Sequence, residues 1–310
     1  MLMSLSLALL ALILIVPSST SLQTKVLNFN GGGIYYWWQA GACKYLNEAG
    51  FQSMDIKVSG ESAGSLSASN LVCDCDFDYA AELAISLCER EDLFNAPTGL
   101  AFKWGPIVEE WLYDLLPASL DDGSSRSRKK LSRLLIKATP LSSLMPFGTR
   151  EVKIFKDFRS KEELIDGLMC SAHIPFFLDT KLYRKMRHEG HNYGHFIDGS
   201  FWNFVSKGDF YSPIPLNIID PTADAKAFVR EEEIFTIDWQ RDVEFSSKLE
   251  QSSFVSLITP QTLYDFLDAG YEFTKKQHKN SMIPAAVLPT SKSKAMYPSI
   301  VGSFARLLTI

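Results

Sequence analysis

The sequence of 310 residues has no excess of basic side chains: 31 Lys and Arg stand against 36 Asp and Glu, for a formal net charge of −5. Nucleic-acid binding normally requires a basic face, so we expect no nucleic-acid partner. No linker rich in Pro, Gly or Ser divides the chain, and no internal repeat is present. With 46% hydrophobic residues, the chain can bury a sizeable core, and one α/β domain is the simplest interpretation.

Histidine is scarce, and its spacing does not suit a metal site. Of the five His, two fall in His188-Glu189-Gly190-His191, one residue short of the His-Glu-x-x-His spacing that places two ligands on one helix face. Cys73-Asp74-Cys75 is one residue short of the Cys-x-x-Cys spacing. His195 follows Gly194, which disfavours a helix as well. The sequence therefore predicts no metal and no cofactor.

The cysteine count is odd, so at least one thiol is unpaired within the chain or is paired with another chain. In an oxidising compartment, a disulfide from Cys73 or Cys75 to Cys88 is one interpretation. The other is that the cysteines are small buried side chains, which is common for free Cys. The five are Cys43, Cys73, Cys75, Cys88 and Cys170.

The N-terminus is an apolar run from Met1 to Val16 that contains no Lys or Arg and is followed by the small residues of Pro17-Ser18-Ser19-Thr20-Ser21. A bilayer-spanning helix needs about 20 residues, so the run is short for a membrane span. We predict that residues 1–21 are a signal peptide, which places the protein in the secretory pathway, secreted or lumenal. A membrane anchor formed by residues 2–16 is the alternative.

The segment Gly60-Glu61-Ser62-Ala63-Gly64 is the strongest chemical signal in the chain. It follows a predicted strand at residues 55–59 and precedes a predicted helix from about Leu66. A Gly-x-Ser-x-Gly pattern in this context is a nucleophile elbow, a tight strand-to-helix turn that exposes the serine hydroxyl between two small neighbours. Ser62 is therefore the candidate nucleophile, with Gly60 and Gly64 as the elbow glycines.

A glycine-rich loop, Gly31-Gly32-Gly33, follows a predicted strand at residues 25–29 and precedes a predicted helix at residues 36–49. Together with the elbow this forms a βαβ unit, whose two loops meet at the carboxyl edge of a parallel sheet. Backbone N–H groups of such a loop suit an oxyanion hole. A phosphate-binding or structural loop is the alternative. This loop is not a Walker loop, because the sequence lacks the required Gly-Lys-Ser/Thr. It does not match a dinucleotide-binding fingerprint either, because Tyr36 stands in place of the third glycine.

Asp198 is a better candidate than any of the five histidines for the base that activates Ser62. In α/β-hydrolases several strands separate the oxyanion loop from the elbow and the base is a His, whereas one helix and one strand intervene here. His278 stands in the Lys-rich end of a predicted surface helix. Asp198 follows a predicted strand at residues 193–197 and precedes Gly199, which suits a carboxylate at the edge of a sheet. An ordinary Asp-Gly turn is the alternative.

Three other segments bear on function. The helix predicted at residues 105–117 has an apolar face typical of a core, with a lid as the alternative. Residues 121–133 are rich in Arg and Lys among Gly and Ser, which predicts a solvated loop or, alternatively, a contact for anionic head groups. The aromatic run at residues 35–38 lines an acyl channel or packs a helix against the sheet.

Four blocks in this order resemble the patatin-like phospholipase family over about residues 26–204. They are Gly31-Gly32-Gly33 with Gly41, Gly60 to Gly64, Ser171-Ala172-His173-Ile174-Pro175, and Asp198-Gly199. The resemblance implies a three-layer α/β/α sandwich with a mainly parallel central sheet. It also implies a Ser-Asp dyad without histidine, with Ser62 as nucleophile, Asp198 as base and Gly31, Gly32 and Gly33 as the oxyanion loop.

The chain departs from the family pattern at two positions. Tyr36 stands where the glycine-rich loop of the family usually has another Gly, and Ser200 follows Asp198-Gly199 where Gly or Ala is usual. Neither departure removes a catalytic group.

The prediction is a lipid acyl hydrolase that works through an acyl-enzyme. The amide of Ala63 would assist the glycine loop in holding the oxyanion. The expected partners of the protein are membrane or lipid-droplet lipids at a membrane surface. The alternative is a non-catalytic patatin-like protein for lipid binding or storage. The expected catalytic domain covers residues 22–280, followed by a C-terminal tail at 281–310.

Overall fold

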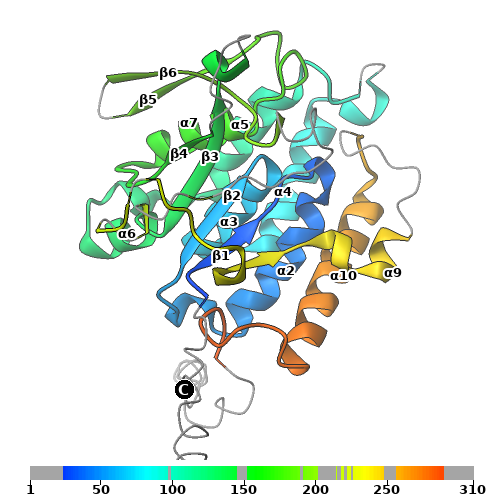
Figure 1. Ribbon diagram of the computed structural model, residues 1–310. Coiled ribbons are helices and arrows are strands. Elements are labelled where there is room, and N and C mark those ends of the chain that lie inside the picture. Colours follow the sequence, from blue (N-terminus) through cyan, green and yellow to red (C-terminus); the bar gives the residue numbers. More distant parts are fainter. Residues whose placement is uncertain are drawn as a thin grey trace, which may run out of the picture.

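The structure is a computed structural model that describes residues 24–96, 99–144, 152–188, 191–201, 214, 218–219, 222–224, 226–247 and 256–289. Within these ranges the strands form a seven-stranded sheet in the order β5-β6-β3-β2-β1-β7, with β4 paired to β3 (Figure 1). The strands are β1 (Val26–Phe29), β2 (Lys57–Glu61), β3 (Leu134–Pro140), β4 (Lys153–Phe155), β5 (Arg184–His188), β6 (His191–Ile197) and β7 (Ile234–Ile237).

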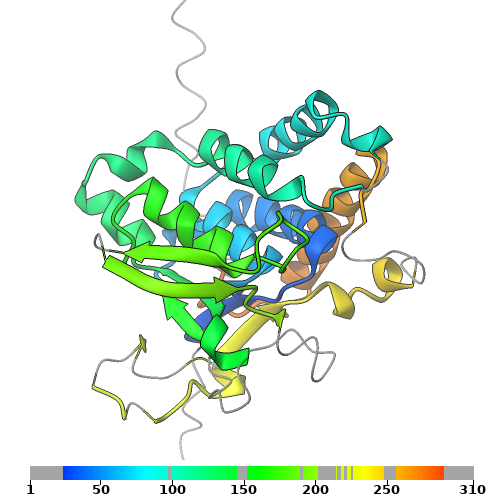
Figure 2. The same cartoon turned by 90° about the horizontal axis from the view of Figure 1, so that it is seen from above.

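Helices flank the sheet, as the predicted α/β/α fold requires, although Figure 2 shows most of them on one side of it. They are α2 (Tyr36–Glu48), α3 (Ala63–Cys73), α4 (Phe77–Arg90), α5 (Trp104–Leu115), α6 (Ser125–Leu131), α7 (Lys161–Ser171), α9 (Val243–Ser246) and α10 (Pro260–Lys279).

The sheet is mixed rather than uniformly parallel. Strands β3, β2, β1 and β7 run parallel to one another, which confirms the βαβ unit formed by β1, α2 and β2. Strands β4 and β6 run antiparallel to β3, and β5 pairs antiparallel with β6. Ile197, the last residue of β6, lies opposite Thr139 near the end of β3. The chain therefore delivers Asp198 to the carboxyl edge of the parallel strands.

Strand β1 is buried along its whole length, which is typical of a central parallel strand covered on both faces. Its alternating side chains enter two cores. Leu27 and Phe29 belong to the large core with the helices, whereas Val26 joins a smaller cluster on the other face with Leu135 and Ile214. The parallel centre of the sheet is thus fixed from both sides.

Helix α10 packs on α2 at a contact that only glycine allows. A Cβ atom at Gly41 would lie 1.8 Å from the Leu267 carbonyl oxygen, and one at Gly270 would lie 1.8 Å from the Trp38 carbonyl oxygen. The two backbones therefore touch directly. This contact fixes the first turn of α10, which lines the pocket described below.

The prediction of a loop at residues 121–133 was wrong because this segment contains α6, although most of its residues are exposed to solvent as expected. Ser124 caps the helix by accepting a hydrogen bond from the Ser127 amide at 3.1 Å, and Leu131 is buried. Arg133 is buried as well, and its Nε donates to the Ile56 carbonyl at 3.1 Å. The cap at Ser124 and the burial of Leu131 stabilise a helix here despite the many basic residues of the segment.

The packed region continues beyond Asn280, since Ile283, Val287 and Leu288 are buried in the large core. The predicted signal peptide lies outside the described residues, as does the rest of the predicted tail from residue 290. No helix in the described ranges is both long and apolar enough to cross a membrane. All five cysteines are buried as free thiols, which agrees with the second interpretation of the cysteines.

We expect Gly41→Ala or Gly270→Ala to destabilise the fold by about 1–3 kcal/mol or more, because the added methyl group must push α2 and α10 apart. At an open helix position the same substitution would stabilise the protein by about 1 kcal/mol. Denaturant unfolding of both variants checks this, with Asp268→Ala on the exposed side of α10 as the control. Stabilisation by either glycine substitution would contradict the close contact.

Candidate active site

Ser62 lies on the turn between β2 and α3 and has a backbone conformation that side chains rarely adopt, with φ 53° and ψ −131°. Strand β2 extends to Glu61, two residues further than the sequence pattern indicated, so the turn is sharper than expected. A positive φ at a residue other than glycine costs about 1–3 kcal/mol and persists only where the surroundings enforce it. The serine is therefore held on a strained elbow, as predicted.

The elbow glycines are required by the approach of strand and helix. A Cβ atom at Gly60 would lie 2.2 Å from the Gly64 carbonyl oxygen, and one at Gly64 would lie 2.2 Å from the Phe29 carbonyl oxygen. No other residue fits either position without moving the backbone. The two glycines thus bring α3 against β1 and β2 and leave Ser62 at the N-terminus of α3.

Ser171 connects the segments of Ser62 and Asp198 from a third part of the chain. Its hydroxyl accepts a hydrogen bond from the Ser62 amide at 3.0 Å and donates to the Lys137 carbonyl at 2.7 Å. Its own carbonyl accepts from the Gly199 amide at 2.8 Å, beside the base. The sequence pattern contained Ser171 in a family block but gave it no role, because these contacts join residues far apart in the chain.

Asp198 is buried next to Ser62. Its Oδ1 atom accepts a hydrogen bond from the Ser200 amide at 2.8 Å, whereas Oδ2 accepts none from the described residues. Burial raises the pKa of Asp198 from 3.8 to about 6, against the lowering effects of the Ser62 hydroxyl and the backbone amides of Ser200 and Phe201. A carboxyl with a pKa near 6 is suited to accept and return a proton near neutral pH.

The glycine loop lies beside the elbow, as the βαβ unit predicted. A Cβ atom at Gly31 would lie 3.2 Å from the Ser62 Cβ and 2.3 Å from the Ser200 hydroxyl oxygen, so the loop packs directly on the nucleophile. Gly33 has a left-handed φ of 56°. The amides of Gly31, Gly32 and Gly33 donate no hydrogen bond to another described residue.

Unsatisfied buried amides are rare, so such groups next to a nucleophile are candidates for oxyanion binding. Gly31 and Gly32 are buried, and Gly33 is partly buried. Ala63 adds the first amide of α3, which no carbonyl of the helix can satisfy. The predicted oxyanion residues therefore lie around Ser62.

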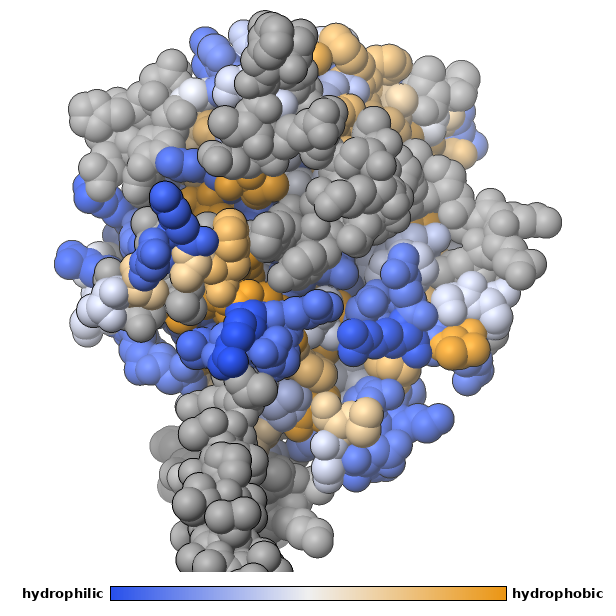
Figure 3. All heavy atoms as spheres, in the orientation of Figure 1, coloured by the Kyte–Doolittle hydropathy of each residue, from blue (hydrophilic) through white to orange (hydrophobic). Residues whose placement is uncertain are grey.

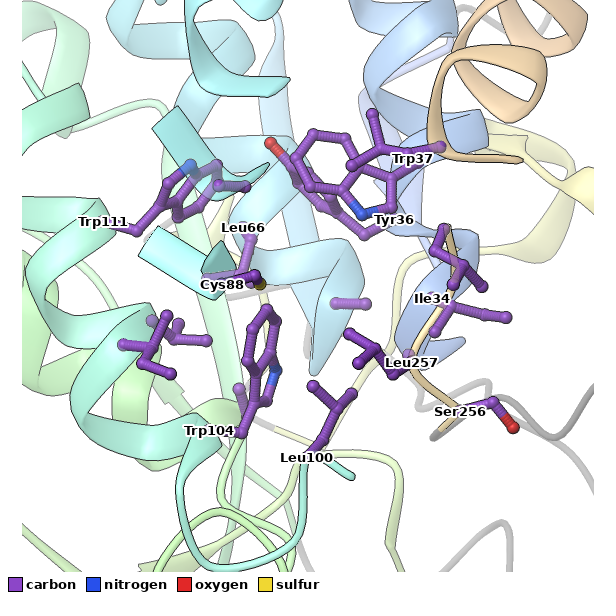
Figure 4. Close-up of a pocket in the computed structure, with 18 of the residues that line it drawn as sticks. Ile34, Tyr36, Trp37, Leu66, Cys88, Leu100, Trp104, Trp111, Ser256 and Leu257 are labelled. Carbon is purple, nitrogen blue, oxygen red and sulfur yellow. The ribbon is translucent and has the colours of Figure 1, made fainter. Parts of the chain in front are cut away.

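An apolar pocket opens from Ser62, and the empty space within it and the solvent at its mouth together amount to about 1080 Å³. Figure 4 shows Tyr36, Trp37, Trp104 and Trp111 around the pocket, and the Trp111 ring packs edge-to-face on Tyr36 with the ring centroids 5.5 Å apart. Asp198 does not line the pocket. The lining side chains come from η1 (Gly33–Tyr35), α2, α3, α4, α5, α10 and the loops near them, and include Ile34, Leu66, Cys88, Leu100, Ile107, Val108, Phe177, Leu178, Leu257 and Leu263.

The pocket answers two alternatives left open by the sequence. Tyr36 and Trp37 line it, so these members of the aromatic run form its wall. The apolar face of α5 is both buried and pocket-lining, since Ile107, Val108 and Trp111 contact the cavity. The apolar face of α5 is therefore part of the core, as predicted.

A buried ion pair lies below the elbow. The Lys137 Nζ is 3.6 Å from the Glu61 Oε2, and both side chains are fully buried. Lys137 also donates to the Asn28 Oδ1 at 3.2 Å, which joins β1, β2 and β3. Burial lowers the pKa of Lys137, while the Glu61 carboxylate opposes this shift. Glu61 is therefore a structural partner of Lys137, a role that the elbow pattern could not indicate.

None of the described histidines lines the pocket. His173 is buried, its Nε2 lies 3.1 Å from the Lys181 carbonyl, and burial lowers its pKa. His278 is not on the surface as expected, because it is buried between the Tyr45 hydroxyl at 2.9 Å and the Pro289 carbonyl at 3.0 Å. The described residues contain no cluster of His, Cys, Asp and Glu that could hold a metal ion.

Comparison with known proteins agrees with this architecture. A profile of the family described as patatin-like phospholipase matches residues 27–218, so the chain belongs to the patatin-like phospholipase family.

Two curated relatives are omega-hydroxyceramide transacylases. The Mus musculus protein is 28% identical over 180 residues, which cover 56% of this chain and 27% of the relative. The Homo sapiens protein is 23% identical over 284 residues, which cover 88% of this chain and 49% of the relative. The chain thus spans less than half the length of either relative.

Among solved structures, VipD from Legionella pneumophila matches with a TM-score of 0.39 and 11% sequence identity. The match covers 82% of this chain and 66% of that one. A likeness this weak does not define the fold, which follows from the strand order and the family match.

We expect Asp198→Asn to stabilise the fold at pH 7 by about 2–3 kcal/mol, because the raised pKa means that ionisation of Asp198 opposes folding. The destabilising effect of the carboxylate is absent below pH 3.8, grows between pH 3.8 and about 6, and is complete above that. Denaturant unfolding at pH 3 and pH 7 checks the sign. Asp268→Asn, at an exposed position, is the control, and lower stability of Asp198→Asn at pH 7 would contradict the assignment.

Proposed function

We propose that this protein is a lipid acyl hydrolase that cleaves carboxylic esters with a Ser62-Asp198 dyad. One observation carries the proposal: a serine on a strained elbow lies beside a buried carboxyl with a raised pKa, at the end of a large apolar pocket. Membership of the patatin-like phospholipase family supports the same chemistry.

The proposed reaction has two stages. In the first, Asp198 accepts the Ser62 proton while Oγ attacks the ester carbonyl, and the loop amides with that of Ala63 hold the oxyanion. Collapse of this intermediate breaks the ester bond, and the departing alcohol takes the proton from Asp198. In the second stage Asp198 deprotonates a water molecule that attacks the acyl-enzyme. Collapse of this intermediate breaks the bond to Oγ and releases the fatty acid, and Oγ takes the proton back from Asp198, which restores Ser62.

The pocket indicates which part of the substrate the protein holds. Almost all lining side chains are aliphatic or aromatic, so the pocket suits a long acyl chain whose carbonyl lies at Ser62. Among the described lining residues few side chains are polar, and the Tyr36 hydroxyl is already bonded to the Asn70 side chain at 2.8 Å. The substrate class is therefore defined by the acyl chain rather than by the head group.

We expect Ser62→Ala and Asp198→Asn each to lower the rate of ester hydrolysis at least about a thousandfold, because the two groups act as one unit. Hydrolysis of a long-chain acyl ester by the purified chain and its variants measures this.

Ser69→Ala is the matched control, since Ser69 is a buried serine of the same helix that does not line the pocket. It should retain the parent rate. Equal rates of hydrolysis in the parent, Ser62→Ala and Asp198→Asn proteins would contradict the dyad, and no hydrolysis by any of them would favour the non-catalytic lipid-binding alternative.

Acyl transfer to a lipid hydroxyl is the second candidate. Both curated relatives are transacylases. The apolar pocket also favours binding of a long-chain alcohol over binding of a water molecule, which is the competing acceptor. An alcohol in place of water in the second stage yields a new ester.

The two candidates differ in their products. With a long-chain acyl ester as donor and a long-chain alcohol as acceptor, a transferase forms the new ester faster than the free fatty acid, and Ser62→Ala forms neither. Accumulation of free fatty acid alone would exclude transfer to that acceptor.

A further inference from the structure

Four large apolar side chains stand exposed on the segments that carry the pocket-lining residues Leu100, Phe177 and Leu178 or precede them, and one of the four, Phe94, lines the pocket itself. Phe94, Phe102, Phe176 and Leu182 are exposed to 38%, 51%, 55% and 42%, and they are called the mouth patch below. In Figure 3 hydrophobic residues gather at the upper right of the molecule, where the segment between α4 and α5 lies in Figure 1. Contiguous apolar surface of this kind marks an interaction site more often than scattered single residues do.

Backbone contacts make the patch continuous with the pocket. The Phe102 amide donates to the Phe177 carbonyl at 2.7 Å, and the Phe176 amide donates to the Lys181 carbonyl at 3.1 Å. Segments 99–103 and 176–182 therefore lie side by side. Within them Leu100 and Phe177 line the pocket, while Phe102 and Phe176 are exposed to solvent.

The two phenylalanines have an unusual backbone. Phe102 has a φ of 67° and Phe176 a φ of 60°. This conformation is uncommon for any side chain and strained for a bulky one, and the other described non-glycine residues that adopt it are all Ser or Asp. Neither ring is buried in return, so folding alone does not explain why phenylalanine occupies these positions.

The charged residues next to Phe102 and Leu182 are basic, whereas the exposed acidic residues Glu91 and Asp92 precede Phe94. Lys103 follows Phe102, Lys181 precedes Leu182, and both lysines are exposed without an ion pair to a described residue. Asp179, in the same segment, lies 3.7 Å from Arg184, which also binds Glu109 at 3.0 Å. The mouth therefore presents aromatic rings flanked by two unneutralised positive charges.

We propose that the mouth patch docks on the surface of a lipid bilayer that contains anionic lipids. The phenylalanines would enter the interface, and the lysines would contact the head groups. Docking would place the mouth against the acyl chains, so that a chain passes from the bilayer into the pocket without crossing water. The inference rests on the proposed function, because an acyl-binding pocket is what selects a lipid surface over a protein partner.

The experiment compares binding to vesicles of phosphatidylcholine mixed with phosphatidylserine, in sedimentation assays. All proteins carry Ser62→Ala so that no lipid is consumed. Asparagine tolerates a positive φ, so Phe102→Asn with Phe176→Asn removes the rings without adding backbone strain. We expect this pair of substitutions to weaken vesicle binding roughly tenfold to a hundredfold, because two exposed rings no longer leave water.

The control is Met282→Asn, which removes an apolar side chain that is 62% exposed just beyond the C-terminus of α10. The first turn of α10 lines the pocket, so Met282 lies about 30 Å from it along the 20-residue helix. This variant should bind vesicles like its parent. Equal binding by the Phe102→Asn, Phe176→Asn protein, or no binding by the parent, would overturn the proposal.

The lysines are tested separately. Lys103→Gln with Lys181→Gln should reduce binding to the anionic vesicles roughly tenfold or more and leave binding to phosphatidylcholine vesicles nearly unchanged. An equal loss on both kinds of vesicle would contradict the head-group contact.

Failure of docking is distinguishable from failure of the proposed function. With Ser62 intact, the Phe102→Asn, Phe176→Asn protein should hydrolyse a short, water-soluble ester at the parent rate and a vesicle-bound ester more slowly. Parent rates on both esters would refute docking and leave the dyad in place. No Ser62-dependent hydrolysis of either ester would refute the proposed function.

Discussion

The hydrogen bonds of Ser171 are the constraint on which the candidate site depends. Residues 62 and 198 are far apart in the chain, and they meet because Ser171 binds the Ser62 amide through its hydroxyl and the Gly199 amide through its carbonyl. The same hydroxyl donates to the Lys137 carbonyl of β3. Since these groups are buried, loss of the hydroxyl would remove the hydrogen bond that the Ser62 amide donates to it. One serine thus sets the separation between nucleophile and base.

The site concentrates features that cost free energy, and the surrounding core compensates for them. Ser62 has a strained backbone, Asp198 carries an ionisable group in a buried position, and the loop amides at residues 31–33 lack partners among the described residues. Each feature destabilises the folded protein but would stabilise the transition state of the proposed reaction. The elbow would present the nucleophile, Asp198 would accept its proton, and the loop amides would bind the oxyanion. The parallel strands and the α2–α10 contact hold these features in place.

Local patterns predicted the parts of the fold that depend on a few adjacent residues. The elbow at Ser62 and the βαβ unit follow from glycine and strand signals of short range. Local patterns did not predict features that depend on contacts between distant residues. His278 is buried by Tyr45 and Pro289. The antiparallel strands of the sheet were not anticipated either. The Glu61–Lys137 pair was missed because one elbow residue and one strand residue, each ordinary alone, meet only in the folded sheet. The roles of Ser62 and Asp198 remain predictions that activity must test.

The most direct test of the dyad is the rate at which an organophosphonate labels Ser62, followed by mass spectrometry across pH in the parent and in Asp198→Asn. The account predicts that labelling of the parent rises with pH through about 6, where Asp198 loses its proton, and then levels off. In Asp198→Asn, labelling should be slow and independent of pH in this range. Rapid labelling of Ser62 in Asp198→Asn, with the same pH dependence as in the parent, would contradict the central claim that Asp198 is the base.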